Sequence, residues 1–401
     1  MRIILLVATV FTYSVVLPTA VLAHPGHEYG PDVPTWTEDT ARQIPLKPDA
    51  IPIRPLLVLV VTLFGAAALL GVLVPKNNSR LAGVLALPAL TGAVLLPSMG
   101  CGTERDKAMP DNHRQARHDV KQLEELMGHF KTEGVTFRSD DAYFYLESNA
   151  FPSHPLMVGI TAWQQQVPLP QPYTGTNAWR IPLQPVVSAK PISAKKALYR
   201  GAIAVAVNGV PIFNALNNRG EDAFLAGELD EYGGHCGRGD DYHYHIAPVH
   251  LEKIVGRGKP IAYALDGFPI YGYTDADGKE PADLDEFNGR FERDGSYRYY
   301  ASRQYPYING GMRGVVTVRG DQIEPQPRDA PVRPAGVPLR GAKITAFTRN
   351  DKEKTYTLKY ELRGATHSVQ YTIGKDGIFM FVFVDDQGRK RIETYRRRGQ
   401  P

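Results

Sequence analysis

Two segments of this chain repeat one hairpin pattern, and this repeat constrains the fold more than any other feature. Residues 203–213 form an apolar run, an Asn-Gly turn and a second apolar run, and residues 261–271 have the same order with an Asp-Gly turn. Both dipeptides accept the positive φ that a two-residue hairpin turn requires. Further on, 229–234 resembles 284–289, and 242–245 falls opposite 297–300 at the same offset. We therefore predict two copies of a β-unit, at about 203–247 and 261–302, paired about a pseudo-twofold axis.

The predicted fold class is mainly β. The duplicated hairpins lie in a β domain over 135–324, a Pro-rich linker follows over 325–338, and a small β module occupies 339–401. Within this module, β-rich runs at 343–348, 354–362, 368–373 and 378–384 are separated by turn-forming dipeptides. Ahead of the β domain, apolar residues recur at three and four spacing over 113–131. That period predicts one amphipathic helix, ending near Gly134, in a helical linker over 103–134.

The first hundred residues have the pattern of an exported, membrane-anchored protein. Residues 1–23 resemble a secretory signal peptide, and a Pro-rich extracytoplasmic segment follows over 24–55. Two apolar runs, 56–74 and 81–96, predict a transmembrane hairpin within 56–97. Lys76 and Arg80 between them favour a cytoplasmic turn. We therefore expect a cell-membrane protein whose globular part lies outside the cytoplasm, on the periplasmic or cell-surface side.

The charge and the cysteine content limit which binding partners and which covalent modifications are expected. The formal net charge of +4 over 401 residues does not favour a nucleic-acid-binding protein. The only two cysteines, Cys101 and Cys236, cannot form a disulfide framework. Cys101 ends the second apolar run after small residues, which leaves lipidation and a plain interfacial thiol as alternatives.

Metal-ligand residue types gather in the first copy of the repeat. Residues two apart on a strand face the same side, so His243 and His245 should project together. His235 and Cys236 precede them across a glycine-containing return, and Asp240 and Asp241 are predicted to support the imidazole rings from behind. Imidazole and thiolate ligands suit a copper or zinc ion.

Three interpretations of this cluster stay open. It could be a metal site, a packed ladder in which the histidines bond to aspartates or backbone, or a metal-free catalytic pair of Cys236 with a histidine. The second copy has Arg290, Phe291, Arg298 and Tyr300 at the equivalent places, which fits one site per chain. The sequence does not decide whether the protein is an enzyme or a metal-free structural or ligand-binding module of the cell envelope.

Three long motifs resemble the YHYH-domain proteins. They are 234–245, which ends in Tyr-His-Tyr-His, 264–272, and 305–311. The resemblance covers roughly 140–320 and implies an exported protein, without specifying a reaction. Members of that family often have a second Tyr-His-Tyr-His, where this chain has Tyr-Arg-Tyr-Tyr.

Overall fold

The computed structural model describes residues 114–397. The predicted signal peptide, the two predicted spans and Cys101 lie outside these residues. Within the described range, none of the helices has the length and apolar character needed to cross a membrane. The chain divides into two compact units, and every described residue belongs to the larger one.

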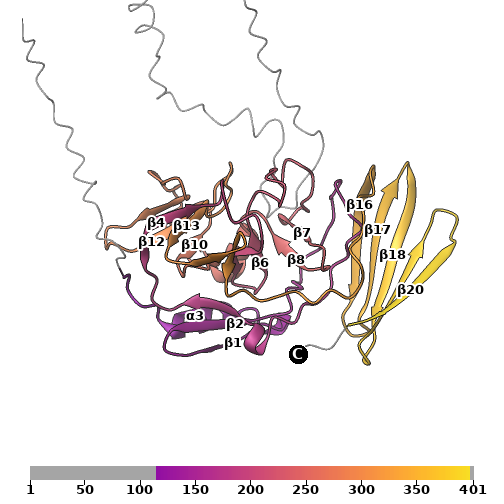
Figure 1. Cartoon of the computed structure of the whole chain (residues 1–401), viewed down its shortest axis with the longest axis horizontal. Helices are drawn as coiled ribbons and strands as arrows, with labels where there is room; N and C mark the ends of the chain where they lie inside the picture. Colours follow the sequence, from indigo (N-terminus) through magenta and orange to yellow (C-terminus); the bar gives the residue numbers. More distant parts are fainter. Residues whose placement is uncertain (1–113, 398–401) are drawn as a thin grey trace, which may run out of the picture. The chain divides into compact units, whose positions relative to one another are not determined.

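The described part is mainly β, as predicted, with an eight-stranded sheet at its centre (Figure 1). The strand order of this sheet is β11-β12-β10-β9-β5-β6-β8-β7. Counted outward from the centre of the sheet, the two halves therefore contain equivalent strands in the same order. The first half contains β5 (Ala202–Ala206), β6 (Pro211–Phe213), β7 (Gly234–Cys236) and β8 (Tyr242–Tyr244). The second half contains β9 (Ala262–Ala264), β10 (Pro269–Tyr271), β11 (Gly289–Phe291) and β12 (Tyr297–Tyr300).

Strand pairing is equivalent in the two halves. Hairpins β5–β6 and β9–β10 are antiparallel, and in each half the second hairpin strand pairs parallel with the strand that carries the Tyr-X-Tyr motif. Antiparallel pairing of β5 with β9 joins the halves, and Val205 lies opposite Tyr263. These two residues are equivalent in the repeat, so the pseudo-twofold axis passes between them. Every residue of β5 and β9 is buried, which places this junction in the hydrophobic core.

Two residues that pack against each other in the first copy of the repeat are both different in the second copy. Gly233, at φ +80°, precedes β7, and a Cβ there would overlap Ile246. The equivalent residue, Asn288, also has a positive φ but carries a side chain, and its counterpart of Ile246 is Ala301. The smaller alanine leaves the room that Asn288 needs, so one turn geometry is kept with different packing.

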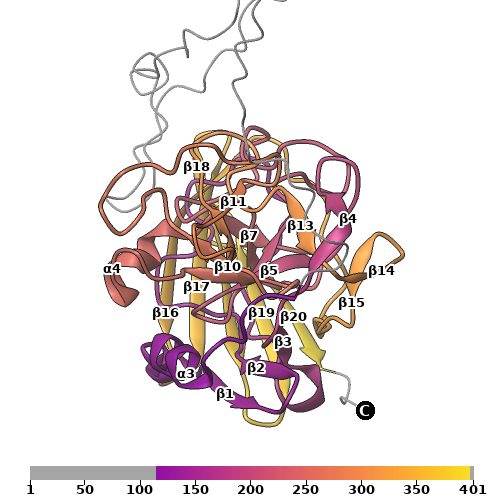
Figure 2. The ribbon, with the colours of Figure 1, turned by 90° about the vertical axis from the view of Figure 1, so that its left-hand side faces the viewer.

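Smaller elements surround the central sheet (Figure 2). The strands β1 (Thr136–Ser139), β2 (Tyr143–Glu147) and β3 (Trp179–Pro182) form a three-stranded antiparallel sheet next to the helix α3 (Val120–Gly128). Two two-stranded sheets are also present: β4 (Val187–Ser193) pairs with β13 (Gly311–Gly314), and β14 (Thr317–Arg319) pairs with β15 (Gln322–Glu324). A short helix, α4, spans Glu252–Val255.

The amphipathic helix is shorter than the sequence period suggests. It begins only after Asp119, whose carboxylate accepts a hydrogen bond from the Lys121 amide and caps the first turn. Before it, the amides of Gln115 and His118 donate to the carbonyls of Pro185 and Leu183, which holds this stretch extended. The helix ends at Gly128, and a separate 3₁₀ turn at Lys131–Glu133 leads to Gly134, which is in the left-handed region.

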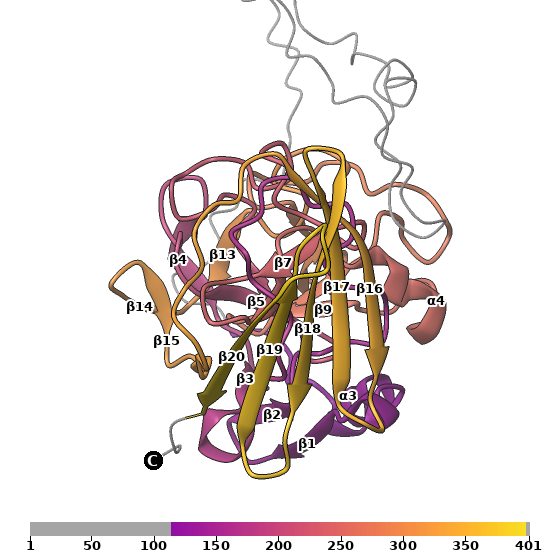
Figure 3. The same ribbon diagram turned by 90° about the vertical axis from the view of Figure 1, so that its right-hand side faces the viewer.

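The C-terminal strands form a five-stranded antiparallel meander (Figure 3). They are β16 (Ala342–Asn350), β17 (Thr355–Leu362), β18 (Ala365–Ile373), β19 (Ile378–Val384) and β20 (Lys390–Arg396). The first four coincide with the β-rich runs of the sequence. Buried residues of this sheet belong to the same hydrophobic core cluster as those of the central sheet, and the hydroxyl of Tyr371 donates to the Pro168 carbonyl at 2.6 Å.

Candidate metal centre

Three imidazole rings meet at one edge of the eight-stranded sheet. His235 on β7 and His243 on β8 are register partners in an antiparallel pair, and His245 follows two residues later. Cross-strand partners and residues two apart share a face, so all three rings project to the same side. Nε2 of His245 lies 3.0 Å from Nε2 of His235 and 3.1 Å from Nε2 of His243. One nitrogen from each of the three rings lies within 4.8 Å of the others.

Backbone carbonyls fix the orientation of two of these rings. Nδ1 of His243 lies 2.9 Å from the Asp241 carbonyl oxygen, and Nδ1 of His245 lies 2.5 Å from the Asn214 carbonyl oxygen. Since a carbonyl oxygen can only accept, both Nδ1 atoms carry the hydrogen. In the neutral rings Nε2 is then unprotonated, and its lone pair points toward the common centre. This is the arrangement that metal-binding histidines usually have.

Burial keeps two of the rings neutral at physiological pH. It lowers the pKa of His245 to about 3, and the neighbouring His243 contributes in the same direction. It also lowers the pKa of His235 well below the ordinary value, with the two other imidazoles lowering it further. A neutral imidazole is the form that binds a metal ion, so protons compete weakly at these two rings.

Cys236 does not lie with the histidines, and its assignment as a ligand is corrected. It is the residue after His235 on β7, and adjacent residues of a strand face opposite sides. Its thiol points into the hydrophobic core, where burial raises its pKa well above the usual value. Because it faces away from the three rings, the thiol is not placed to share an ion with them, and its raised pKa disfavours the thiolate that a nucleophile requires.

The two predicted supporting aspartates have different roles. Asp240 is turned away from the rings and forms a buried ion pair with Arg333, 2.8 Å from Oδ2 to Nε, while its Oδ1 accepts the Val167 amide. Asp241 does support the site, through its carbonyl to His243 and through a carboxylate oxygen 3.4 Å from the same Nδ1.

Two supporting residues were missed by the sequence reasoning. Asn214 follows β6 and supplies the carbonyl that orients His245, and Phe213 stacks on His243 with ring centroids 3.9 Å apart. Both reach the site because β6 pairs parallel with β8. The repeat could have indicated this pairing only if the strand order had been known.

Residues 178–282 match the family described as YHYH protein. The chain contains a YHYH domain. The match includes all three histidines of the cluster, and the Tyr-His-Tyr-His motif contributes two of them. No curated protein and no solved structure matches the chain.

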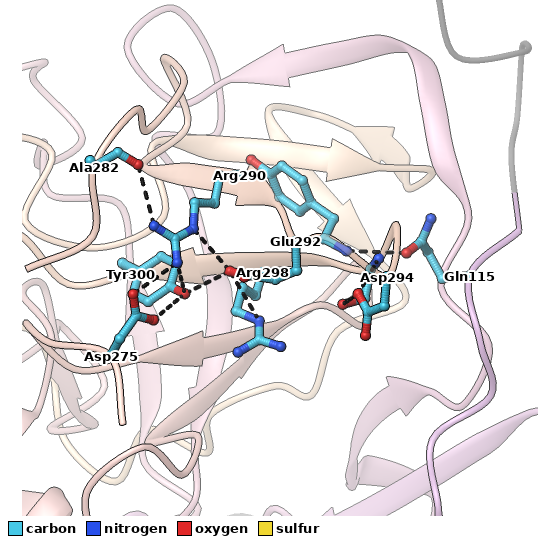
Figure 4. Close-up of polar contacts among 10 residues, drawn as sticks. Gln115, Asp275, Ala282, Arg290, Glu292, Asp294, Arg298 and Tyr300 are labelled. Atoms are coloured by element: carbon cyan, nitrogen blue, oxygen red, sulfur yellow. Dashed lines mark hydrogen bonds and ion pairs between the residues drawn. The ribbon is translucent and has the colours of Figure 1, made fainter. Parts of the chain in front are cut away.

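The second half of the duplicated sheet replaces the imidazoles with an ion-pair network (Figure 4). Arg290, equivalent to His235, lies 2.8 Å from Asp275 and 2.9 Å from Glu292. The hydroxyl oxygen of Tyr300, equivalent to His245, lies 2.7 and 2.9 Å from the same two carboxylates and donates its one hydrogen to one of them. These contacts occupy the groups that face the equivalent point, so the YHYH domain has one imidazole centre in its described residues.

A cavity of about 620 Å³ opens over the imidazole centre of the YHYH domain. His235, His243 and His245 all line it. Much of its wall comes from the loops after β6 and between β7 and β8, from the residues just before β5, and from the segment around β14 and β15. Residues between positions 164 and 179 complete it. An ion held by the three rings would therefore face a space large enough for a small molecule.

Proposed function

We propose that this protein binds one zinc or copper ion through Nε2 of His235, His243 and His245. The observation that carries the proposal is the convergence of these nitrogens while backbone carbonyls hold the Nδ1 hydrogens of His243 and His245. With both Nδ1 atoms donating, neutral His243 and His245 have no proton to share across their 3.1 Å contact. A bound cation removes the resulting repulsion between lone pairs.

The ligand set supports a functional site with an open position. Three imidazoles without a thiolate suit zinc or copper rather than magnesium or calcium. Zinc sites with three protein ligands leave a position for water or substrate, whereas purely structural sites are closed by four. An ion held by these three histidines would have the cavity beside it, which supports a metal that takes part in ligand binding or chemistry.

A titration of the purified full-length protein tests this proposal. After treatment with chelator, the protein should bind one equivalent of Zn²⁺ or Cu²⁺ per chain at neutral pH. Cobalt(II) should bind at the same stoichiometry and give the strong visible absorption of a four-coordinate site. A chain that retains no ion after dialysis against micromolar metal would favour the metal-free structural or ligand-binding module instead.

We further propose that the domain is anchored to the cell membrane and lies outside the cytoplasm. The signal-like start, the two apolar runs and the cationic turn at Lys76 and Arg80 support this topology. Alkaline phosphatase fused after residue 110 should be active, and fused at Asn78 it should be inactive. The reverse pattern would place the domain in the cytoplasm.

A further inference from the structure

The cavity over the three histidines is lined by five arginines from separate segments of the chain. Arg200 precedes β5, Arg219 lies in the loop after β6, Arg238 lies between β7 and β8, Arg319 ends β14, and Arg328 follows β15. All five are exposed at the cavity. No lysine lines it.

Four of these guanidinium groups have nothing to neutralise them in the part of the chain that the structure describes. Arg219 pairs with Glu221 and with the buried Glu228. The side chains of the other four make no hydrogen bond or ion pair with any of residues 114–397. By contrast, Arg290 in the second half of the sheet is paired with Asp275 and Glu292.

The acidic residues of the cavity do not cancel this charge. They are Glu228, already paired with Arg219, and Asp241 and Asp329. Asp241 accepts the Gly239 amide and lies against His243, so it is engaged at the floor of the cavity. Asp329 is exposed, and partial desolvation together with the nearby Asp241 raises its pKa. Cations therefore outnumber acids in the wall, and most of the cations are unpaired.

From this arrangement we infer that the cavity binds a small molecule carrying an oxyanion, with phosphate as the simplest case. The planar fork of arginine matches the oxygens of phosphate or carboxylate and donates two parallel hydrogen bonds, which lysine cannot do. The inference rests on the proposed function in one respect: a metal ion at the histidines would offer a second contact to the same ligand. The arginines themselves do not depend on the ion.

Calorimetric titration of the full-length protein with inorganic phosphate tests the inference, once on metal-free and once on metal-loaded protein. Phosphate should bind in both states, more weakly at high salt, because unpaired surface charges are screened. Arg238→Ala and Arg319→Ala should each weaken binding about tenfold, the usual effect of losing one charge-assisted hydrogen bond. Arg238→Lys should lose less than Arg238→Ala, since it keeps the charge. Arg340→Ala, at an exposed arginine outside the cavity, is the matched control and should bind like wild type.

The outcomes separate this inference from the metal proposal. Phosphate binding that depends on the cavity arginines, in a protein that takes up no metal, supports the inference and contradicts the proposed function. Metal uptake without phosphate binding in either state overturns the inference and leaves the proposed function intact. Phosphate binding that neither Arg238→Ala nor Arg319→Ala weakens also overturns it, since the anion would then be held elsewhere.

Discussion

Replacing His245 with alanine is expected to weaken zinc or copper binding by roughly several hundredfold. His245 is the middle of the three rings, with its Nε2 within 3.1 Å of the other two. Four-ligand zinc sites bind with roughly 10–16 kcal/mol, so one ligand accounts for about 3–4 kcal/mol. That free energy corresponds to a factor of several hundred, roughly 150 to 700, in the dissociation constant. Competition with a chromophoric chelator at neutral pH measures the change.

Two further variants protect this test from a folding artefact. His235 lies on an edge strand and is only half-buried. The His235→Ala variant should therefore fold and show a similar loss of metal affinity. Tyr300→Phe changes the equivalent of His245 in the second half and should bind metal like wild type. If both histidine variants retain wild-type affinity while their circular dichroism is unchanged, the three rings are a packed ladder and no metal centre.

Replacing Asp230 with alanine should lower the free energy of unfolding by about 4 kcal/mol or more. This carboxylate is 2% exposed and accepts the amides of Met157, Tyr232 and Gly234 and the hydroxyl of Tyr242, at 2.8–3.1 Å. Each buried donor left without an acceptor costs about 1–3 kcal/mol. Urea unfolding followed by tryptophan fluorescence gives the difference.

The repeat supplies a matched control for this substitution. Asp285 makes the equivalent bonds to the amides of Phe287 and Gly289 and to the Tyr297 hydroxyl. It is exposed, so water can replace the lost acceptor, and Asp285→Ala should cost only about 1–2 kcal/mol. If the two variants lost equal free energy of unfolding, burial would not determine how much the hydrogen bonds of Asp230 stabilise the fold.

Local signals made the central hairpins predictable. The Asn-Gly and Asp-Gly turns act within four residues, and in both hairpins the turn glycine amide bonds to the carbonyl three residues back, Gly209 to Ala206 and Gly267 to Ala264. The fifth strand of the C-terminal sheet was not predicted, because β20 is largely exposed and charged and lacks an apolar face.

Only those features of the site that follow from the two-residue period of a β-strand could be predicted from the sequence. Spacing of two residues correctly put His243 and His245 on one face. The same rule separates His235 from Cys236, but it applies only once 234–236 is known to be a strand rather than a loop. The partner of Asp240 is Arg333, 93 residues away in sequence. No local pattern in a single sequence indicates such a contact.

The strand order also determines how the duplicated sheet ends. Its outermost strands, β7 and β11, are each three residues long. Unpaired strand edges template the addition of further chains, and very short edge strands are one way in which β proteins avoid aggregation. Because the two halves are related by the axis between β5 and β9, a single short strand in the repeating unit protects both borders of the sheet against self-association.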